Sequence, residues 1–218
     1  FIESIRSVLP LCDEMIVSVG HSEDDTLQRV KQIGDPKIRI METVWDDSLR
    51  EGGRVLAVET DKAKAAVSSD TDWCIYIQAD EVLHEKDYPA IRRAMQENLN
   101  DKRVDGLLFD HLNFYGSFDY IADSRKWNYK QIRVIRNDAA IKSFRDAISF
   151  MKNGKRLRVK KTDATVYHYG WVRKPETMQK KLESFHKMWH DDEWIEKNLD
   201  KADSFDYKNI DSLAHFTG

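Results

Sequence analysis

Hydrophobic positions in the first half of the chain alternate between helical spacing and short apolar runs. Apolar residues recur at helical spacing over 1–9, and a compact apolar run then predicts a strand over 15–19. The alternation continues with a helix over 27–33, a strand over 37–44, a helix over 54–68 and a strand over 73–77. Strands that alternate with helices favour parallel pairing, so this half predicts a doubly wound sheet.

The pattern changes in the second half. A helix over 88–99 precedes strands over 104–115, 129–137 and 156–160, which follow one another without an intervening helix. A helix over 175–190 and a polar tail from 191 complete the chain. We therefore expect one α/β domain over 1–218, with a Rossmann-like, mixed but mainly parallel sheet flanked by helices.

An acidic patch follows the apolar run at 73–77. The sequence there reads Gln78-Ala79-Asp80-Glu81. Open α/β sheets bind ligands at the carboxyl ends of their strands, and a divalent cation would relieve the cost of placing two carboxylates together. The alternative is structural, because an acidic patch also begins many helices and further charged residues follow at 85–87. Local chemistry leaves both interpretations open.

Composition and charge narrow the classes of function. The chain has 218 residues, of which 41% are hydrophobic, enough for a sizeable core. Its net charge of −3 gives no overall signal for binding nucleic acid, and no apolar run reaches the length of a membrane span. The only cysteines are Cys12 and Cys74, which do not form a disulfide framework and favour a cytoplasmic location.

Four segments, taken in order, resemble the nucleotide-sugar glycosyltransferases of the A-type fold, specifically the broad family 2. They are the strand ending Val17-Ser18-Val19-Gly20 with its acidic loop to Thr26, the stretch Trp73 to Glu81, the Ser143-Phe144-Arg145-Asp146 segment and the late Val166-Tyr167-His168-Tyr169-Gly170-Trp171 segment. Two features depart from the family pattern. Gln78 stands where a first Asp is usual, and the family's opening strand, ahead of the helix that here begins at Phe1, is absent from this sequence.

The resemblance implies an enzyme that moves a sugar from a nucleoside diphosphate sugar to an acceptor hydroxyl, inverting and metal-dependent, with Mn²⁺ or Mg²⁺ as cofactor. It implies a nucleotide-sugar half over about 1–100, an acceptor half over about 101–175 and a C-terminal helical tail over about 176–218. The acceptor would be a glycan, a lipid-linked molecule or a small molecule. The enzyme would act in the cytoplasm or at the inner face of the membrane, in peripheral contact with it and without a transmembrane segment.

Three residues would carry the reaction. By the resemblance, Asp80 and His168 hold the metal, since Mn²⁺ accepts both carboxylate and imidazole ligands. Asp146 matches the family's acidic residue and would be the general base that takes the proton from the acceptor hydroxyl. Structural alternatives stay open: His168 as an inert core histidine, and Asp146 as a salt-bridged turn carboxylate. Asp110, Asp119 and Asp123 are rival bases.

A second set would bind the nucleotide sugar. Its members are Asp24, Asp25, Arg54, Asp61 and Gln78. Capping of the following helix is the alternative for at least one of the two aspartates at 24–25, and a solvated helix face is the alternative for Asp61. Arg54 follows two glycines, which lack the full spacing of a phosphate-binding loop.

Two further functions remain as alternatives to the transferase. One is a nucleotidyltransferase with the same type of sheet, and the other is a catalytically inactive sugar- or nucleotide-binding relative.

The basic run over 152–161 suggests either a solvated strand or contact with an anionic acceptor or membrane. The asparagine–glycine pair at 153–154 within it predicts a hairpin turn.

Overall fold

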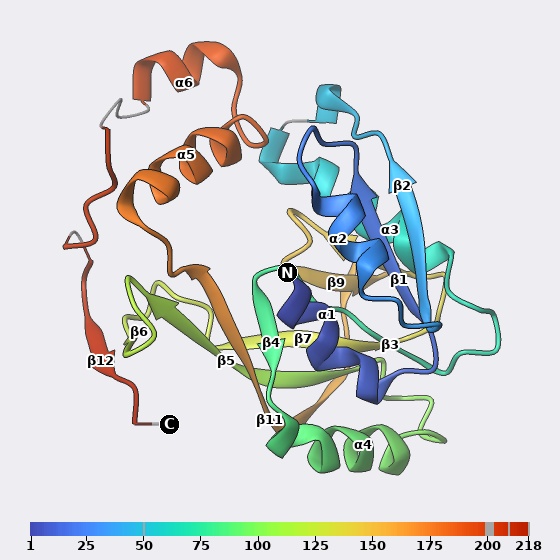
Figure 1. Ribbon diagram of the computed structural model, residues 1–218. Helices are drawn as coiled ribbons and strands as arrows, with labels where there is room; N and C mark the ends of the chain where they lie inside the picture. The colour runs from blue at the N-terminus through green and yellow to red at the C-terminus, as the bar shows by residue number, and fades with distance from the viewer. Residues whose placement is uncertain (50, 199–202, 209, 218) are drawn as a thin grey trace.

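A mixed sheet built around β5 (Gly106–Tyr115) forms the centre of the computed structural model, which describes residues 1–49, 51–198, 203–208 and 210–217 (Figure 1). β11 (Val159–Trp171) runs parallel to one edge of β5. β7 (Lys130–Arg136) and β6 (Tyr120–Ala122) pair antiparallel with successive parts of its other edge. The outer strands are all antiparallel to their neighbours: β4 (Glu81–Leu83) on β11, β3 (Trp73–Ile75) on β7 and β12 (Leu213–His215) on β6.

Two smaller sheets flank the centre. β1 (Met15–Gly20) and β2 (Ile38–Thr43) pair in parallel, and α2 (Thr26–Gln32) makes the crossover that a parallel pair requires. β8 (Ile141–Phe144), β9 (Ser149–Lys152) and β10 (Lys155–Arg156) form an antiparallel sheet. Asn153 and Gly154 join β9 to β10 with φ of 49° and 72°. The hairpin predicted at this pair is therefore confirmed, since positive φ at both positions suits a tight hairpin turn.

Five further helices complete the described chain. The first four agree with the helical periodicity of the sequence, whereas the last lies in the segment interpreted as a polar tail. They are α1 (Ile2–Val8), α3 (Arg54–Ala65), α4 (Tyr88–Glu97), α5 (Pro175–His186) and α6 (Asp192–Asn198), with 3₁₀ turns at Leu9–Leu11, Asp47–Leu49, Glu51–Gly53 and Glu85–Asp87. In the described part of the chain no helix is both long and apolar enough to cross a membrane. The tail predicted as helical, 176–218, also contains β12. Within that tail, 199–202, 209 and 218 lie outside the described residues.

The prediction of a mixed α/β fold is confirmed, but the sheet is not mainly parallel. Among the described strands, parallel pairing occurs only between β1 and β2 and between β5 and β11. The alternation of helices and strands correctly placed β1 and β2 together. It failed for β3, whose hydrogen bonds go to the later strand β7 in the antiparallel sense. As a result β1 and β3 belong to different sheets, with a cleft between them lined by both.

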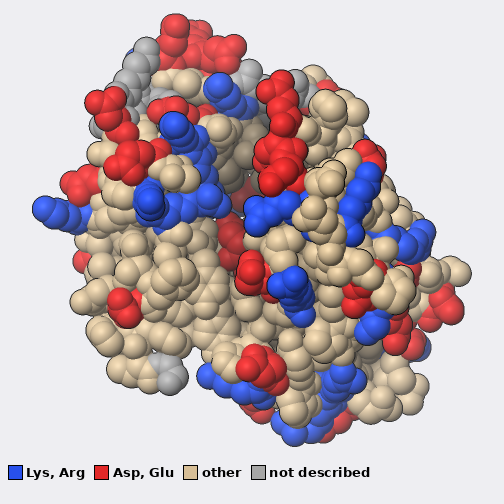
Figure 2. Space-filling model, viewed as in Figure 1, with Lys and Arg blue, Asp and Glu red and all other residues tan. Residues whose placement is uncertain are grey.

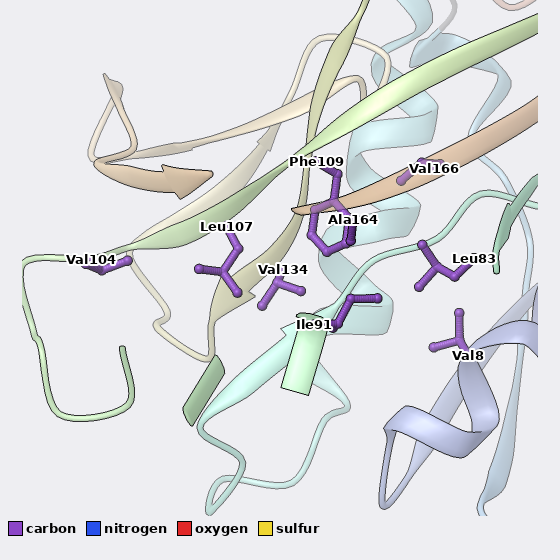
Figure 3. Packing of buried hydrophobic residues seen from close by; sticks show 9 residues of the cluster. All are labelled: Val8, Leu83, Ile91, Val104, Leu107, Phe109, Val134, Ala164 and Val166. Carbon is purple, nitrogen blue, oxygen red and sulfur yellow. The ribbon is translucent and has the colours of Figure 1, made fainter. Parts of the chain in front are cut away.

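The largest apolar cluster joins the central sheet to the helices on one face (Figure 3). Leu107 and Phe109 of β5 and Val134 of β7 are fully buried there, against Ile91 of α4 and Val8 of α1. Burying a side chain of this size contributes about 1.5–3 kcal/mol. A second cluster packs α1 and α2 on β1, and a third packs β7 against β8 and β9. These clusters hold the strand ends that carry the candidate site.

Candidate functional site

The acidic patch forms a turn between two strands. The backbone N–H of Glu81 donates to the carbonyl of Gln78 at 3.0 Å, and the chain then enters β4 rather than a helix. The interpretation of this patch as a helix start is therefore wrong. The N–H of Tyr169 donates to the carbonyl of Asp80 at 2.8 Å, which ties the turn to β11. This bond places the side chain of Asp80 beside that of His168.

Asp80, His168 and Lys181 converge in space from three separate segments. Oδ2 of Asp80 lies 3.5 Å from Nε2 of His168 and 3.3 Å from Nζ of Lys181, which comes from α5. Nζ of Lys181 also donates to the carbonyl of Gly170 at 2.9 Å. The side chains of Asp80 and His168 are 28% and 15% exposed, so both reach the surface of the cleft without being freely solvated.

Gly170 packs so closely against this pair that no side chain fits there. A Cβ at Gly170 would lie 2.5 Å from Nε2 of His168 and 2.6 Å from Oδ2 of Asp80. Real Cβ atoms essentially never approach other atoms this closely. The missing side chain therefore makes a small cradle whose walls are a carboxylate oxygen and an imidazole nitrogen.

The electrostatics of the site keep Asp80 charged. Burial raises the pKa of Asp80, but the neighbouring side chains of His168 and Lys181 together outweigh burial and hold the pKa well below its usual range. A carboxylate that stays ionised at neutral pH offers its full negative charge to a cation or to a donor in the cleft.

Glu81, although adjacent in sequence, faces the interior. Its side chain is 1% exposed and accepts from Nε and Nη2 of Arg133 at 2.8 and 2.5 Å. Nε2 of His111 lies 3.2 Å from the same carboxylate. Burial raises the pKa of Glu81, but the charge of Arg133 and the hydrogen bonds from His111 and Arg133 together outweigh burial and lower the pKa to about 2. Glu81 thus stays charged, with its charge balanced by Arg133 inside the fold, and it does not face the cleft.

Asp146 lies at the tip of the β8–β9 hairpin. The residues on either side of it, Arg145 and Ala147, have φ of 55° and 63°. Non-glycine residues rarely adopt such values, and this strain occurs often at functional sites. A Cβ at Gly53 would lie 2.7 Å from Cβ of Asp146, so glycine at 53 is what lets the hairpin tip approach α3. Burial raises the pKa of Asp146.

One cleft of about 2110 Å³ joins these groups. Gln78, Asp80, His168, Lys181 and Asp146 all line it. Figure 2 shows a hollow near the middle of the face viewed, with acidic side chains in its depth and basic ones at its sides. Both predicted metal ligands and the predicted base therefore line the same cleft.

The predicted nucleotide-sugar set is only partly assembled. Gln78 and Asp24 line the cleft, whereas Asp25, Arg54 and Asp61 are not among its lining residues. Asp24 accepts from the backbone N–H of Thr26 at 3.0 Å in a turn just before α2, whereas Asp25, the N-cap residue, makes no side-chain capping hydrogen bond. Arg54 is exposed at the first position of α3.

Asp61 has a structural partner instead of a ligand position. Its Oδ1 accepts from the backbone N–H of Ser143 at 2.9 Å, so it fastens α3 to β8. The prediction that Asp61 faces the sugar is not met, because β8 covers this side of the helix. The sequence could not indicate this contact, since helix and strand are distant along the chain.

The rival bases are also placed elsewhere. Asp110 forms an ion pair with Lys161 at 2.8 Å, and Asp119 and Asp123 are exposed near β6. None of the three is a lining residue of the cleft.

In the basic run over 152–161, Lys152 and Arg158 both contact Asp105, at 3.1 and 2.9 Å. These pairs favour the interpretation of this run as a charged, solvated strand.

Four residues around the site escaped the sequence analysis: Lys181, Arg133, His111 and Asn113. A signal existed for the last two. The buried face of β5 reads Leu107, Phe109, His111 and Asn113, and polar residues on an apolar strand face require buried partners. No comparable signal marks Lys181, which reaches Asp80 only through the docking of α5.

Asp80 and His168 fit a divalent cation that also takes ligands from a substrate. Mg²⁺ and Mn²⁺ sites in phosphate-transferring proteins often use one or two protein ligands, with phosphate oxygens and waters completing the shell. The cradle at Gly170 opens between the two side chains. In the described residues, no cluster of three or more His, Cys, Asp or Glu side chains is arranged to hold a metal without such help.

No model of a known protein family matches this chain, and no curated protein matches it.

Proposed function

We propose that this chain is a glycosyltransferase that moves a sugar from a nucleoside diphosphate sugar to an acceptor hydroxyl with inversion. The observation that carries the proposal is the convergence of Asp80 and His168 on one cleft that Asp146 also lines. In this proposal the fold is a variant of the A-type glycosyltransferase fold, with the sugar donor on the side of β1 and β3 and the acceptor near the β8–β9 hairpin.

The cleft would divide the chemistry between its two acidic groups. Asp146 would accept the proton of the acceptor hydroxyl, whose oxygen then bonds to the anomeric carbon as the bond to the diphosphate breaks. A raised pKa makes Asp146 a better proton acceptor than an ordinary aspartate, and its half-buried position limits competition from water. Asp80 would stay ionised throughout, as its lowered pKa requires.

Asp80 and His168 would hold Mn²⁺ or Mg²⁺, which neutralises the charge that develops on the departing diphosphate. Lys181 would support the same task, because its ammonium group lies 3.3 Å from Asp80 and would add positive charge beside the diphosphate. Gln78 would orient the donor through its amide group, which at present donates to the hydroxyl of Tyr76 at 3.2 Å.

Thermal unfolding with a panel of nucleoside diphosphate sugars tests the proposal. A donor at 100 times its Kd stabilises the folded state by about 2.7 kcal/mol, which corresponds to a Tm increase of roughly 5–10 °C for a chain of this size. We expect the shift to require Mn²⁺ or Mg²⁺ and to vanish in Asp80→Asn. Asp110→Asn, which changes an exposed aspartate outside the cleft, is the matched control.

Turnover assays then separate the alternatives. Release of nucleoside diphosphate in the presence of an acceptor supports the transferase. Donor binding without release of nucleoside diphosphate to water or to any glycan, lipid-linked or small acceptor indicates an inactive sugar- or nucleotide-binding relative. Release of pyrophosphate from a nucleoside triphosphate and a sugar phosphate indicates a nucleotidyltransferase. If no nucleoside diphosphate stabilises the protein under any metal condition, the proposed function is wrong.

A further inference from the structure

The His168 ring contacts a buried amide on the neighbouring strand. Asn113 of β5 and His168 of β11 are register partners, and Oδ1 of Asn113 lies 3.0 Å from Nδ1 of His168. Asn113 is only 5% exposed. A buried side chain that forms this contact is a candidate for controlling which nitrogen of His168 carries the hydrogen.

The orientation of the Asn113 amide is itself fixed. Its Nδ2 donates to the backbone carbonyl of Asn128 at 3.0 Å. A carbonyl oxygen only accepts, so turning the amide over would place two oxygens 3.0 Å apart and lose the hydrogen bond to Asn128. Oδ1 must therefore face His168, and because Oδ1 also only accepts, Nδ1 of His168 must be the donor.

This hydrogen bond decides what His168 presents to the cleft. With the hydrogen on Nδ1, the neutral ring has its lone pair on Nε2, which lies 3.5 Å from Oδ2 of Asp80. Two electron-pair donors then point into the cradle next to Gly170. The opposite form of the ring, with hydrogen on Nε2, would donate to Asp80 and leave no lone pair for a cation.

His111 supports the same arrangement from the other side. Its ring stacks on His168 with centroids 5.4 Å apart and planes at 29°. Nδ1 of His111 lies 3.2 Å from the carbonyl of Asn128, the acceptor that also fixes Asn113. One backbone carbonyl therefore anchors both the amide that bonds His168 and the ring that packs against it.

We propose that Asn113 is a positioning residue that holds His168 in the form with hydrogen on Nδ1, so that the Nε2 lone pair faces Asp80. The link to metal binding rests on the proposed function, whereas the form of the ring does not. In metal sites, a partner on the second ring nitrogen fixes the orientation of a histidine ligand, and losing such a partner typically weakens metal binding about 10- to 100-fold.

Nitrogen-15 NMR of histidine-labelled protein tests the proposal directly, because the two neutral forms of the ring give different nitrogen shifts and couplings. We expect His168 in the wild-type protein to carry hydrogen on Nδ1. Asn113→Leu, which keeps the volume and removes the acceptor, should move the ring toward the form with hydrogen on Nε2. Asn113→Asp, which keeps an acceptor oxygen, should retain the wild-type form. Gln131→Leu, another buried polar side chain on the sheet, is the control and should leave His168 unchanged.

Titration with Mn²⁺ alone provides the second measurement. We expect Mn²⁺ to broaden the His168 signals selectively, and Asn113→Leu to weaken its binding about 10- to 100-fold. Hydrogen on Nε2 in the wild-type protein would overturn the role of Asn113, and this result can be obtained even if the variants fail to fold. Hydrogen on Nδ1 without any Mn²⁺ binding would leave that role intact and would contradict the metal-dependent function.

Discussion

Replacing Gly170 with alanine tests whether the cradle next to Asp80 and His168 is a binding site. The new Cβ would lie 2.5 Å from Nε2 of His168 and 2.6 Å from Oδ2 of Asp80, whereas ordinary contact begins at 3.4 Å. The two side chains must therefore retreat by just under 1 Å each. Because the φ of Gly170 is not in the left-handed region, the backbone accepts alanine and the effect comes from the side chain alone.

The magnitudes follow from this geometry. Overpacking lowers the free energy of unfolding by about 1–3 kcal/mol. Replacing glycine with alanine restricts the unfolded chain, which offsets about 0.4–1 kcal/mol of that loss. We expect a net loss of about 0.5–2 kcal/mol. The effect on the site should be larger, because a displacement of about 1 Å can cost about 100-fold in a catalytic arrangement. We therefore expect Mn²⁺ affinity and kcat/KM to fall by about that factor.

Isothermal titration measures the Mn²⁺ affinity, steady-state transfer assays measure kcat/KM, and urea unfolding measures the stability. Gly106→Ala is the matched control, because its Cβ would lie 2.7 Å from the carbonyl of Val134 in the central sheet and its φ is also outside the left-handed region. The control should lose stability and keep its Mn²⁺ affinity. If Gly170→Ala binds Mn²⁺ within twofold of the wild-type protein, the cradle does not hold the cation and the reasoning is refuted.

Three further substitutions test other parts of the site. Asp146→Asn should lower kcat by about 10²- to 10⁴-fold with donor affinity unchanged, and near-normal turnover would show that another group is the base. Arg133→Met should lower the free energy of unfolding, measured in urea, by about 3–5 kcal/mol, because it leaves the Glu81 carboxylate buried without a positive partner. Adding Glu81→Leu should recover much of that loss, and equal stability of the single and double variants would contradict the pairing. The pKa of Glu81 in the folded protein, about 2, is below its ordinary value of 4.5. The wild-type protein should therefore lose stability as pH falls from about 4.5 to about 2. In Glu81→Gln, the free energy of unfolding should depend less on pH over this range.

Local patterns predicted the elements better than their pairing. The helices up to α5 and the strands up to β3 could be predicted because each depends on its own periodicity. β11 was predicted only over 156–160, although the strand extends to Trp171. Its buried positions Thr162, Ala164 and Val166 alternate as a strand requires, but the polar Asp163 and Thr165 between them obscured the pattern. The pairing of β3 with β7 could not be predicted, since it depends on contacts between residues distant in sequence.

The same distinction holds for the candidate site, where residues in short local segments could be predicted and residues brought in by packing could not. Asp80, His168 and Asp146 were found from short segments and their order along the chain. Lys181 could not be found, because only the packing of α5 brings it to Asp80. Three predicted ligands, Asp25, Arg54 and Asp61, were assigned from position along the chain, and the fold directs at least Asp61 to a neighbouring strand.

The adjacent carboxylates at 80 and 81 have different electrostatic roles, and this difference changes the argument for a metal. If both faced the cleft, their mutual repulsion alone would favour a divalent cation. Arg133 already compensates Glu81 inside the fold, and Lys181 lies beside Asp80. The case for a cation therefore depends on Asp80 together with the Nε2 lone pair of His168, and not on an excess of negative charge. A cation held by so few protein groups should bind weakly alone and more tightly with a nucleoside diphosphate, whose oxygens supply the missing ligands. Equal Mn²⁺ affinity with and without the diphosphate would contradict this division of roles.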